Sequence, residues 1–196
     1  MMNKLKILAI ADLHHWEESE IVRIGSLEYD CCCLLGDIPE DAIGAIREQV
    51  HKPLFGVLGN HDTYGMLRNS GVEDIDRRAV VVNGVTFAGL SGSHRYKFGE
   101  MYPMMTQDES IRAAALVPPC DILISHDTAF HAMKRIDKAH CGLEGISRYI
   151  KTNKPKLNIF GHYHTNANIS YKGSILMCVF RCALISFPQN TMDIIF

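Results

Sequence analysis

Short apolar runs alternate with more polar segments along most of the chain, and this alternation predicts strands separated by helices. The apolar runs predict strands at residues 4–11, 31–35, 53–58, 121–125 and 156–160. The polar segments between them predict helices at residues 39–50, 108–116 and 143–152. Pro39 lies near the start of the first helix, and Pro118 ends the second.

Two further regions are rich in β-forming residues and predict antiparallel pairing. Asn83-Gly84 separates two such runs within residues 79–90, which is a strong hairpin signal. From Asn168 onward, three more β-rich runs follow. Strand–helix units combined with hairpins are typical of a layered α/β fold with mixed sheets.

The length and composition favour one globular unit. A chain of 196 residues suits a single domain over residues 1–196, and 47% apolar with 21% charged residues is usual for a soluble protein. The net charge of −2 argues against duplex DNA or RNA as the main partner, although it leaves room for a local basic patch.

The cysteines and the first residues favour a cytoplasmic protein. Cys31, Cys32 and Cys33 are consecutive among seven cysteines, and neighbours on a strand face opposite ways, so this run is a poor disulfide framework. The first apolar run leads directly to Asp12 and His14 without a small-residue cleavage site, which favours a first strand over a signal peptide. No apolar run is long enough to span a bilayer, so no membrane partner is expected.

Five of the predicted strands end in residues that can bind a metal ion. In chain order these residues are Asp12 and His14, Asp37, Asn60, His126, and His162 with His164. Ligands of α/β sheets bind beyond the carboxyl ends of the strands, so a sheet that joins these runs would gather the side chains at one edge. Alternate residues share one face of an extended chain, which lets each Asp-x-His or His-x-His pair reach one centre.

The residue types favour two divalent cations. Asp, Asn and His suit Mn²⁺, Fe, Zn²⁺ or Ni²⁺, and there are about twice as many candidates as one tetrahedral ion needs. Glycines precede Asp37, Asn60 and His162, where they permit tight turns and close backbone approach. An isolated Asp-x-His or Gly-Asp pair is more often an ordinary polar loop, but the joint occurrence at five strand ends argues against that interpretation.

With these motifs the chain resembles the calcineurin-like metallophosphoesterase superfamily from Asp12 to His164. The resemblance implies a four-layer αββα sandwich of two mixed sheets flanked by helices, with a dinuclear metal site at the strand-end loops. It assigns the ligands as follows: Asp12, His14 and His164 to the first ion, Asp37 to both ions, and Asn60, His126 and His162 to the second. His61 would be a catalytic residue near the leaving group and not a ligand.

The chain departs from one branch of that superfamily. The protein Ser/Thr phosphatases read GDxxDRG after the second strand, whereas residues 36–41 read GDIPED and lack the Arg. This absence argues against a phosphoprotein phosphatase. Glu40 falls where the family's Asp orients the histidine that matches His61, and Asp62 is the competing candidate for that role.

The resemblance implies hydrolysis of a phosphate ester by a hydroxide that bridges the two ions, with Asp37 holding both and His61 assisting the leaving oxygen. The chain has little room for a cap domain, which favours a small molecule or nucleotide, as phosphodiester or phosphomonoester. A nuclease-type phosphodiesterase and a non-catalytic metal-bound scaffold are the alternatives. Mn²⁺ is the favoured ion, and the oligomeric state stays open.

A polar cluster, His94-Arg95-Tyr96-Lys97, follows the predicted hairpin. It is either a loop that contacts the substrate or an ordinary solvated loop. His140 precedes a predicted helix whose first amides could meet an anion, or it is a spare histidine of that turn. His94, Arg95 and His140 are therefore the candidate substrate contacts, and the role of residues 91–105 stays open.

Overall fold

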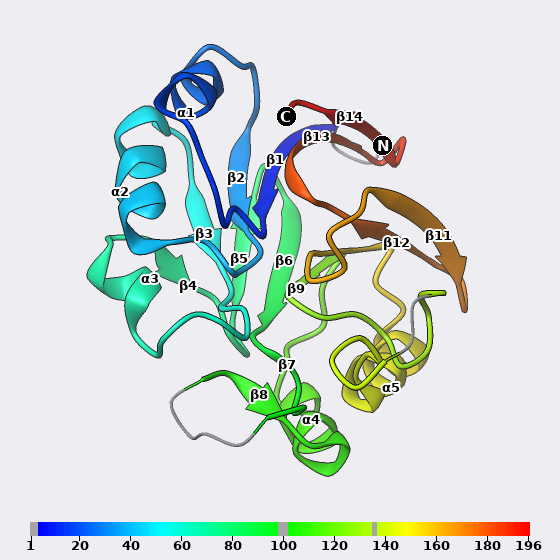
Figure 1. Ribbon diagram of the computed structural model, residues 1–196. Helices are drawn as coiled ribbons and strands as arrows, with labels where there is room; N and C mark the ends of the chain where they lie inside the picture. The colour runs from blue at the N-terminus through cyan, green and yellow to red at the C-terminus, as the bar shows by residue number, and fades with distance from the viewer. Residues whose placement is uncertain (1–3, 98–101, 135–136) are drawn as a thin grey trace.

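The computed structural model describes residues 4–97, 102–134 and 137–196, which form two mixed sheets packed face to face (Figure 1). In spatial order the first sheet consists of β14 (Thr191–Ile194), β13 (Arg181–Phe187), β1 (Leu5–Ala11), β2 (Cys31–Leu34), β3 (Leu54–Gly56) and β4 (Glu73–Asp74). The second sheet consists of β11 (Ala167–Tyr171), β12 (Ser174–Cys178), β10 (Leu157–Phe160), β9 (Ile122–Ser125), β6 (Val85–Leu90) and β5 (Ala79–Val82). Strands β7 (Ser93–His94) and β8 (Met104–Met105) pair separately.

Parallel strands form the part of each sheet that matters for the site. Strands β1 to β4 run parallel in the first sheet, as do β6, β9, β10 and β12 in the second. Hairpin partners add antiparallel strands at the remaining positions. Because neighbouring parallel strands end on the same side, the loops after β1, β2 and β3 lie together, and so do those after β9 and β10.

The helices cover the outer faces of the sandwich. Helices α1 (Glu18–Gly25) and α2 (Glu40–Gln49) pack against the first sheet, and α4 (Gln107–Ala114) and α5 (Glu144–Asn153) pack against the second. A short helix, α3 (Met66–Asn69), follows the loop after β3. The central apolar cluster, with Ile7, Phe55, Phe87 and Ile159, lies between the sheets. These four layers confirm the predicted αββα sandwich.

Among the predicted elements, the boundaries shift by at most two residues. The hairpin turn is confirmed: Val82 pairs with Val85, and Asn83 and Gly84 both have positive φ, at 48° and 78°. Helix α1 lies where the apolar pattern predicts no element, because its buried stripe consists of two residues, Ile21 and Ile24.

None of the helices in the described part of the chain combines the length and the apolar character that crossing a membrane requires. Part of the segment at residues 91–105, namely 98–101, lies outside the described residues.

Candidate metal centre

The first of two ligand groups combines Asp12, His14 and His164, whose ligand atoms lie within 4.8 Å of one another. Nε2 of His14 lies 3.2 Å from Nε2 of His164, which lies 3.5 Å from Oδ1 of Asp12. This Oδ1 atom is buried and has no hydrogen-bond partner among the described residues. A buried carboxylate oxygen without a donor is costly unless a cation meets it, so the group fits a metal ion.

The second group combines Asp37, His126 and His162, and Asn60 joins it. Nδ1 of His126 lies 2.8 Å from the carbonyl oxygen of Leu35, which can only accept, so Nδ1 carries the proton. In the neutral ring, Nε2 then carries a lone pair. This atom lies 3.0 Å from Oδ1 of Asn60 and 3.4 Å from Oδ2 of Asp37. Three acceptor atoms around one point also fit a cation.

Backbone carbonyls hold the other ring nitrogen of both buried histidines. Leu35 does so for His126, and the carbonyl oxygen of Ala139 lies 2.8 Å from Nε2 of His162. Nδ1 of His162 is thereby left as the ligand atom. Metal-binding histidines usually have such a second partner, which fixes the tautomer and the ring orientation. A backbone carbonyl leaves no signal in the sequence, so only the fold identifies Ala139.

Four candidate ligands have backbone angles that L-residues rarely adopt. Asp12, Asp37, His162 and His164 have φ of 52°, 55°, 69° and 49°. Non-glycine residues in this left-handed region are uncommon and cluster at functional sites. The chain therefore turns sharply at the residues that supply the ligand atoms.

The glycines before the ligands allow close approach, as predicted. A Cβ atom at Gly59 would lie 2.1 Å from Oδ1 of Asp37, and one at Gly161 would lie 2.7 Å from Oδ2 of Asp12. Both distances are shorter than van der Waals contact, so any side chain at these positions would displace a candidate ligand.

The family model of the calcineurin-like phosphoesterases matches residues 5–166, which is most of the chain and includes every candidate ligand. The chain belongs to the calcineurin-like phosphoesterase family. The family typically has a dinuclear metal site, and the two ligand groups are the candidates for it here.

Three solved structures share the fold of this family member. TT1561 of Thermus thermophilus is 16% identical with a TM-score of 0.73, covering 99% of this chain and 100% of its own. Phosphopantetheinyl hydrolase from Mycobacterium tuberculosis is 15% identical with a TM-score of 0.65, covering 90% and 89%. A dimetal phosphatase from Danio rerio is 12% identical with a TM-score of 0.64, covering 92% and 91%. No curated protein matches at the sequence level.

His61 lies at the exposed side of this candidate centre. Its backbone N–H donates to Oδ1 of Asp37 at 2.7 Å, while its side chain is 55% exposed. The ring meets that of His14 edge-on, with centroids 5.9 Å apart, and its Nε2 is 4.0 Å from Oδ2 of Asp37. The imidazole is therefore near both ligand groups and open to a substrate.

For the two candidate orienting partners of His61, the contacts within the described residues are as follows. Oδ2 of Asp62 accepts from the backbone N–H groups of Gly59 at 2.7 Å and Asp37 at 2.9 Å. Burial, together with the charge of Asp37, raises the pKa of Asp62 to about 6. Asp62 thus joins the loops after β2 and β3, and Glu40 is an exposed residue at the start of α2 with no described contact to His61.

The three candidate substrate contacts each have a partner within the protein. The backbone N–H of His94 donates to Oδ2 of Asp127 at 3.1 Å. Arg95 forms an ion pair with Glu109 of α4 at 3.0 Å. His140 stacks on His162 with ring centroids 4.7 Å apart.

Another member of the polar cluster reaches the centre instead. The hydroxyl oxygen of Tyr96 accepts a hydrogen bond from Nδ2 of Asn60 at 3.2 Å, which orients Oδ1 of Asn60 toward His126. The sequence places Tyr96 in that cluster without separating it from its neighbours. Only the path of the loop after β7 brings its hydroxyl to Asn60.

Burial and neighbouring charges shift the pKa values of four candidate ligands. Burial lowers the pKa of His14 and of His162 and favours the neutral rings that bind metals. Burial alone would raise the pKa of Asp37, but the facing His126 holds it well below its usual value. Burial alone would lower the pKa of His126, but Asp37 raises it. Without a metal ion, Asp37 thus favours a proton on His126 in the gap between the two side chains, which is the position that a bound cation would take.

Proposed function

We propose that this protein hydrolyses phosphate esters of small molecules or nucleotides and uses two divalent cations. The observation that carries the proposal is the convergence of candidate ligand atoms in two groups, one of which contains the buried Oδ1 of Asp12, an oxygen with no hydrogen-bond partner among the described residues. Such groups are costly without cations and useful with them. The full ligand set favours an enzyme over the non-catalytic scaffold.

The candidate site residues would have two roles, metal binding and proton transfer. Asp12, His14 and His164 would hold one ion, and Asn60, His126 and His162 the other, with Asp37 between them. When bound, the ions would activate water and offset charge on the phosphoryl oxygens. His61, protonated, would donate to the leaving oxygen, since its ring is exposed beside both groups.

The metal and the location are further parts of the proposal. Carboxylate, amide and imidazole ligands accommodate Mn²⁺, which we favour, as well as Fe, Zn²⁺ and Ni²⁺. A cytoplasmic location is supported by the seven cysteines, all of which are unpaired.

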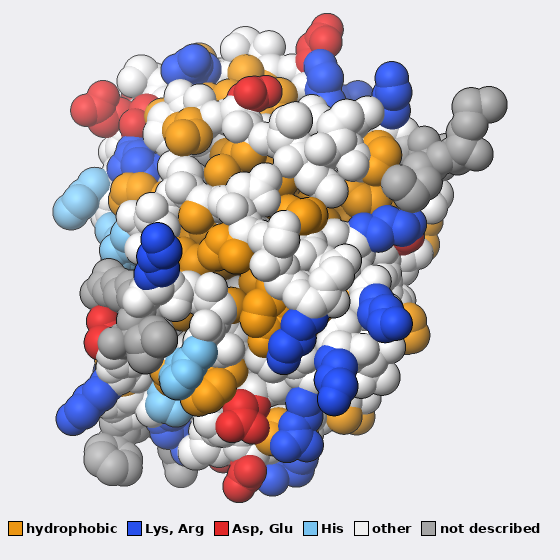
Figure 2. All heavy atoms as spheres, turned by 90° about the vertical axis from the view of Figure 1, so that its right-hand side faces the viewer, with side chains coloured by type: hydrophobic (Ala, Val, Ile, Leu, Met, Phe, Trp, Pro, Cys, Tyr) orange, Lys and Arg blue, Asp and Glu red, His pale blue; other side chains and the backbone are white. Residues whose placement is uncertain are grey.

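A small substrate fits the surface better than a long polyanion. On the face shown in Figure 2, Lys and Arg side chains stand at separate places, several of them on the lower right, with Asp and Glu side chains nearby and apolar side chains between. A nuclease that follows a strand would favour a continuous basic groove.

The test compares an aryl phosphodiester with an aryl phosphomonoester, using metal-stripped protein to which Mn²⁺ is returned. We expect turnover that requires the metal, and Asp37→Ala should lose both turnover and most of the bound metal. His51→Ala, which replaces an exposed histidine of no assigned role, is the matched control. Two bound ions with no turnover of either ester would contradict the proposal.

A further inference from the structure

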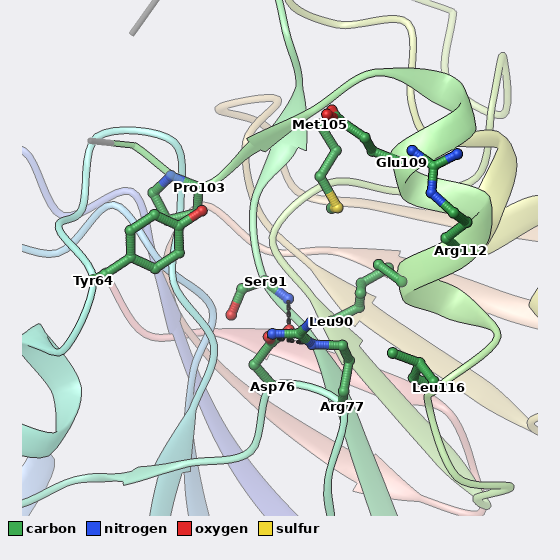
Figure 3. A pocket seen from close by; sticks show the side chains of 11 residues that line it. Tyr64, Asp76, Arg77, Leu90, Ser91, Pro103, Met105, Glu109, Arg112 and Leu116 are labelled. Atoms are coloured by element: carbon green, nitrogen blue, oxygen red, sulfur yellow. Dashed lines mark hydrogen bonds and ion pairs between the residues drawn. The ribbon is translucent and has the colours of Figure 1, made fainter. Parts of the chain in front are cut away.

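A cavity of about 310 Å³ lies between α4, the ends of β6 and β8, and the segment before α3 (Figure 3). Tyr64, Leu90, Met105 and Leu116 supply much of its apolar wall. Charged side chains, among them Arg112 of α4, line the rest. No candidate metal ligand lines this cavity, so it is separate from the two ligand groups.

Two loops connect the cavity to the metal centre. Tyr64 follows Asn60 by four residues, so at about 3.8 Å per residue their Cα atoms are at most about 15 Å apart. Ser91, which also lines the cavity, accepts a hydrogen bond from the backbone N–H of Leu58 at 3.0 Å. The loop that carries Asn60 therefore also supplies a wall of the cavity, and a second wall is hydrogen-bonded to the same loop.

The cavity has unusually exposed apolar walls. Five large hydrophobic side chains are exposed among the described residues, and two of them line this cavity from separate segments: Tyr64 at 66% and Leu116 at 65% exposed. Exposed apolar side chains scattered singly are normal, but their meeting around one hollow indicates a binding surface.

Of the charged side chains that line the cavity, Arg112 is the one for which no side-chain hydrogen bond or ion pair is found among the described residues. Asp76 accepts from Arg77 at 2.7 Å and from a backbone N–H, so both of its oxygens have partners. Glu109 accepts from Arg95 at 3.0 Å and from a backbone N–H at 2.8 Å. The guanidinium of Arg112 is exposed and, within residues 4–97, 102–134 and 137–196, makes no hydrogen bond or ion pair. Its charge does act on Glu109 one helical turn earlier, where it adds to the hydrogen bonds from Thr106 that lower the pKa of that carboxyl.

We propose that this cavity binds the leaving group of the substrate, a claim that rests on the proposed phosphoesterase function. The ligand class is an apolar ring or chain that carries an anionic group. The apolar part would lie against Tyr64, Leu90 and Leu116, and the anionic group would pair with Arg112.

The kinetic test uses two methyl aryl phosphodiesters, one with a neutral 4-nitrophenyl and one with a 4-carboxyphenyl leaving group. We expect Arg112→Ala to raise KM for the carboxylate ester about tenfold, as for a lost charged hydrogen bond, with kcat within about twofold. The neutral ester should be unaffected. Comparing each ester with its own wild-type value removes the difference in intrinsic reactivity. A phosphonate-bearing third ester shows which anion is preferred.

The matched control is Arg148→Ala, which removes an exposed arginine of α5 whose side chain is 66% exposed and which does not line this cavity. It should leave both esters unchanged. Equal effects of Arg112→Ala on the two esters, or no effect on either, would overturn the proposal.

A binding measurement separates this proposal from the proposed function. Metal-free protein is titrated with 4-hydroxybenzoate, the released alcohol, and followed by NMR shifts. We expect Arg112→Ala to weaken this binding about tenfold and Asp37→Ala to leave it unchanged. That result would support the cavity as a binding site even if no ester is turned over. If turnover requires the metal but Arg112→Ala changes neither the binding of 4-hydroxybenzoate nor the KM of the carboxylate ester, the proposed phosphoesterase function is supported. The cavity is then not its leaving-group site.

Discussion

His61 illustrates how backbone and side chain divide tasks at a single residue. Its N–H donates to Asp37 and positions that carboxylate, whereas its ring is half exposed beside both ligand groups. A substitution that removes the ring retains the N–H. The two roles can therefore be separated by mutation.

We expect His61→Ala to bind both metal ions and to lose between about 10²- and 10⁴-fold in kcat, the range for a lost general acid. Metal content by elemental analysis and steady-state kinetics measure the two effects. Full activity in the variant would remove His61 from the mechanism. Loss of metal instead would indicate that the ring is a ligand.

Gly59 allows a test of close packing around a ligand. Gly59→Ala should cost about 1–3 kcal/mol in free energy of unfolding, because the added Cβ would lie 2.1 Å from Oδ1 of Asp37. Metal affinity should fall as well. Gly44→Ala is the matched control: it lies inside α2 with no atom within 4 Å of the new Cβ, and should gain about 0.5–1 kcal/mol. Denaturant unfolding that ranks the two variants otherwise would contradict this packing.

At the scale of elements, strand pairing continues into the ligand loops. Beyond β1 and β2, the N–H of Asp12 donates to the carbonyl of Gly36 at 3.0 Å. Beyond β9 and β10, the N–H of Gly161 donates to the carbonyl of His126 at 3.0 Å. The register of the parallel strands thus sets the position of each candidate ligand along the strand direction. At the opposite ends of β9 and β10, an ion pair joins the two strands.

That ion pair joins Asp121 to Lys156 at 2.7 Å. Burial alone would raise the pKa of Asp121, but hydrogen bonds from Lys156 and the N–H of Thr86 lower it. A lowered folded-state pKa stabilises the protein above the ordinary carboxyl pKa of about 4, and this contribution is lost as pH falls through the lowered value.

We expect Asp121→Asn to cost at most about 1 kcal/mol at pH 7, since both side chains are partly exposed to screening solvent. The difference from wild type should shrink steadily below about pH 4. Urea unfolding at pH 7 and pH 3 measures it. A difference that grows toward acid pH would reverse the assigned sign.

At the scale of the whole molecule, the centre joins the two sheets. Oδ2 of Asp12, after β1, accepts from the N–H of His162, after β10, at 2.7 Å. The ring of His126, after β9, bonds to the carbonyl of Leu35, after β2, at 2.8 Å. Each ligand group draws on both sheets, so ions bound there would hold the layers together.

Metal binding should accordingly raise thermal stability. With free Mn²⁺ at 100 times its Kd, one site adds about 2.7 kcal/mol, which corresponds to roughly 5–10 °C in Tm for a chain of this size. Differential scanning fluorimetry with Mn²⁺ or a chelator measures the shift. Asp12→Asn should show a smaller rise. An unchanged wild-type Tm would argue that the ions do not bind the folded state.

The sequence by itself determined the strand-end positions of the candidate ligands, the hairpin at Asn83-Gly84 and the layered architecture, because apolar periodicity and turn chemistry are local properties. It also indicated the glycines that admit close contacts. The fold decided what depends on distant segments meeting: the carbonyl of Ala139 behind His162, the hydroxyl of Tyr96 on Asn60, and the ion pair between Arg95 and Glu109. Such contacts join residues far apart in the chain, and the local sequence pattern predicts neither the distance between the two residues nor the direction of their side chains.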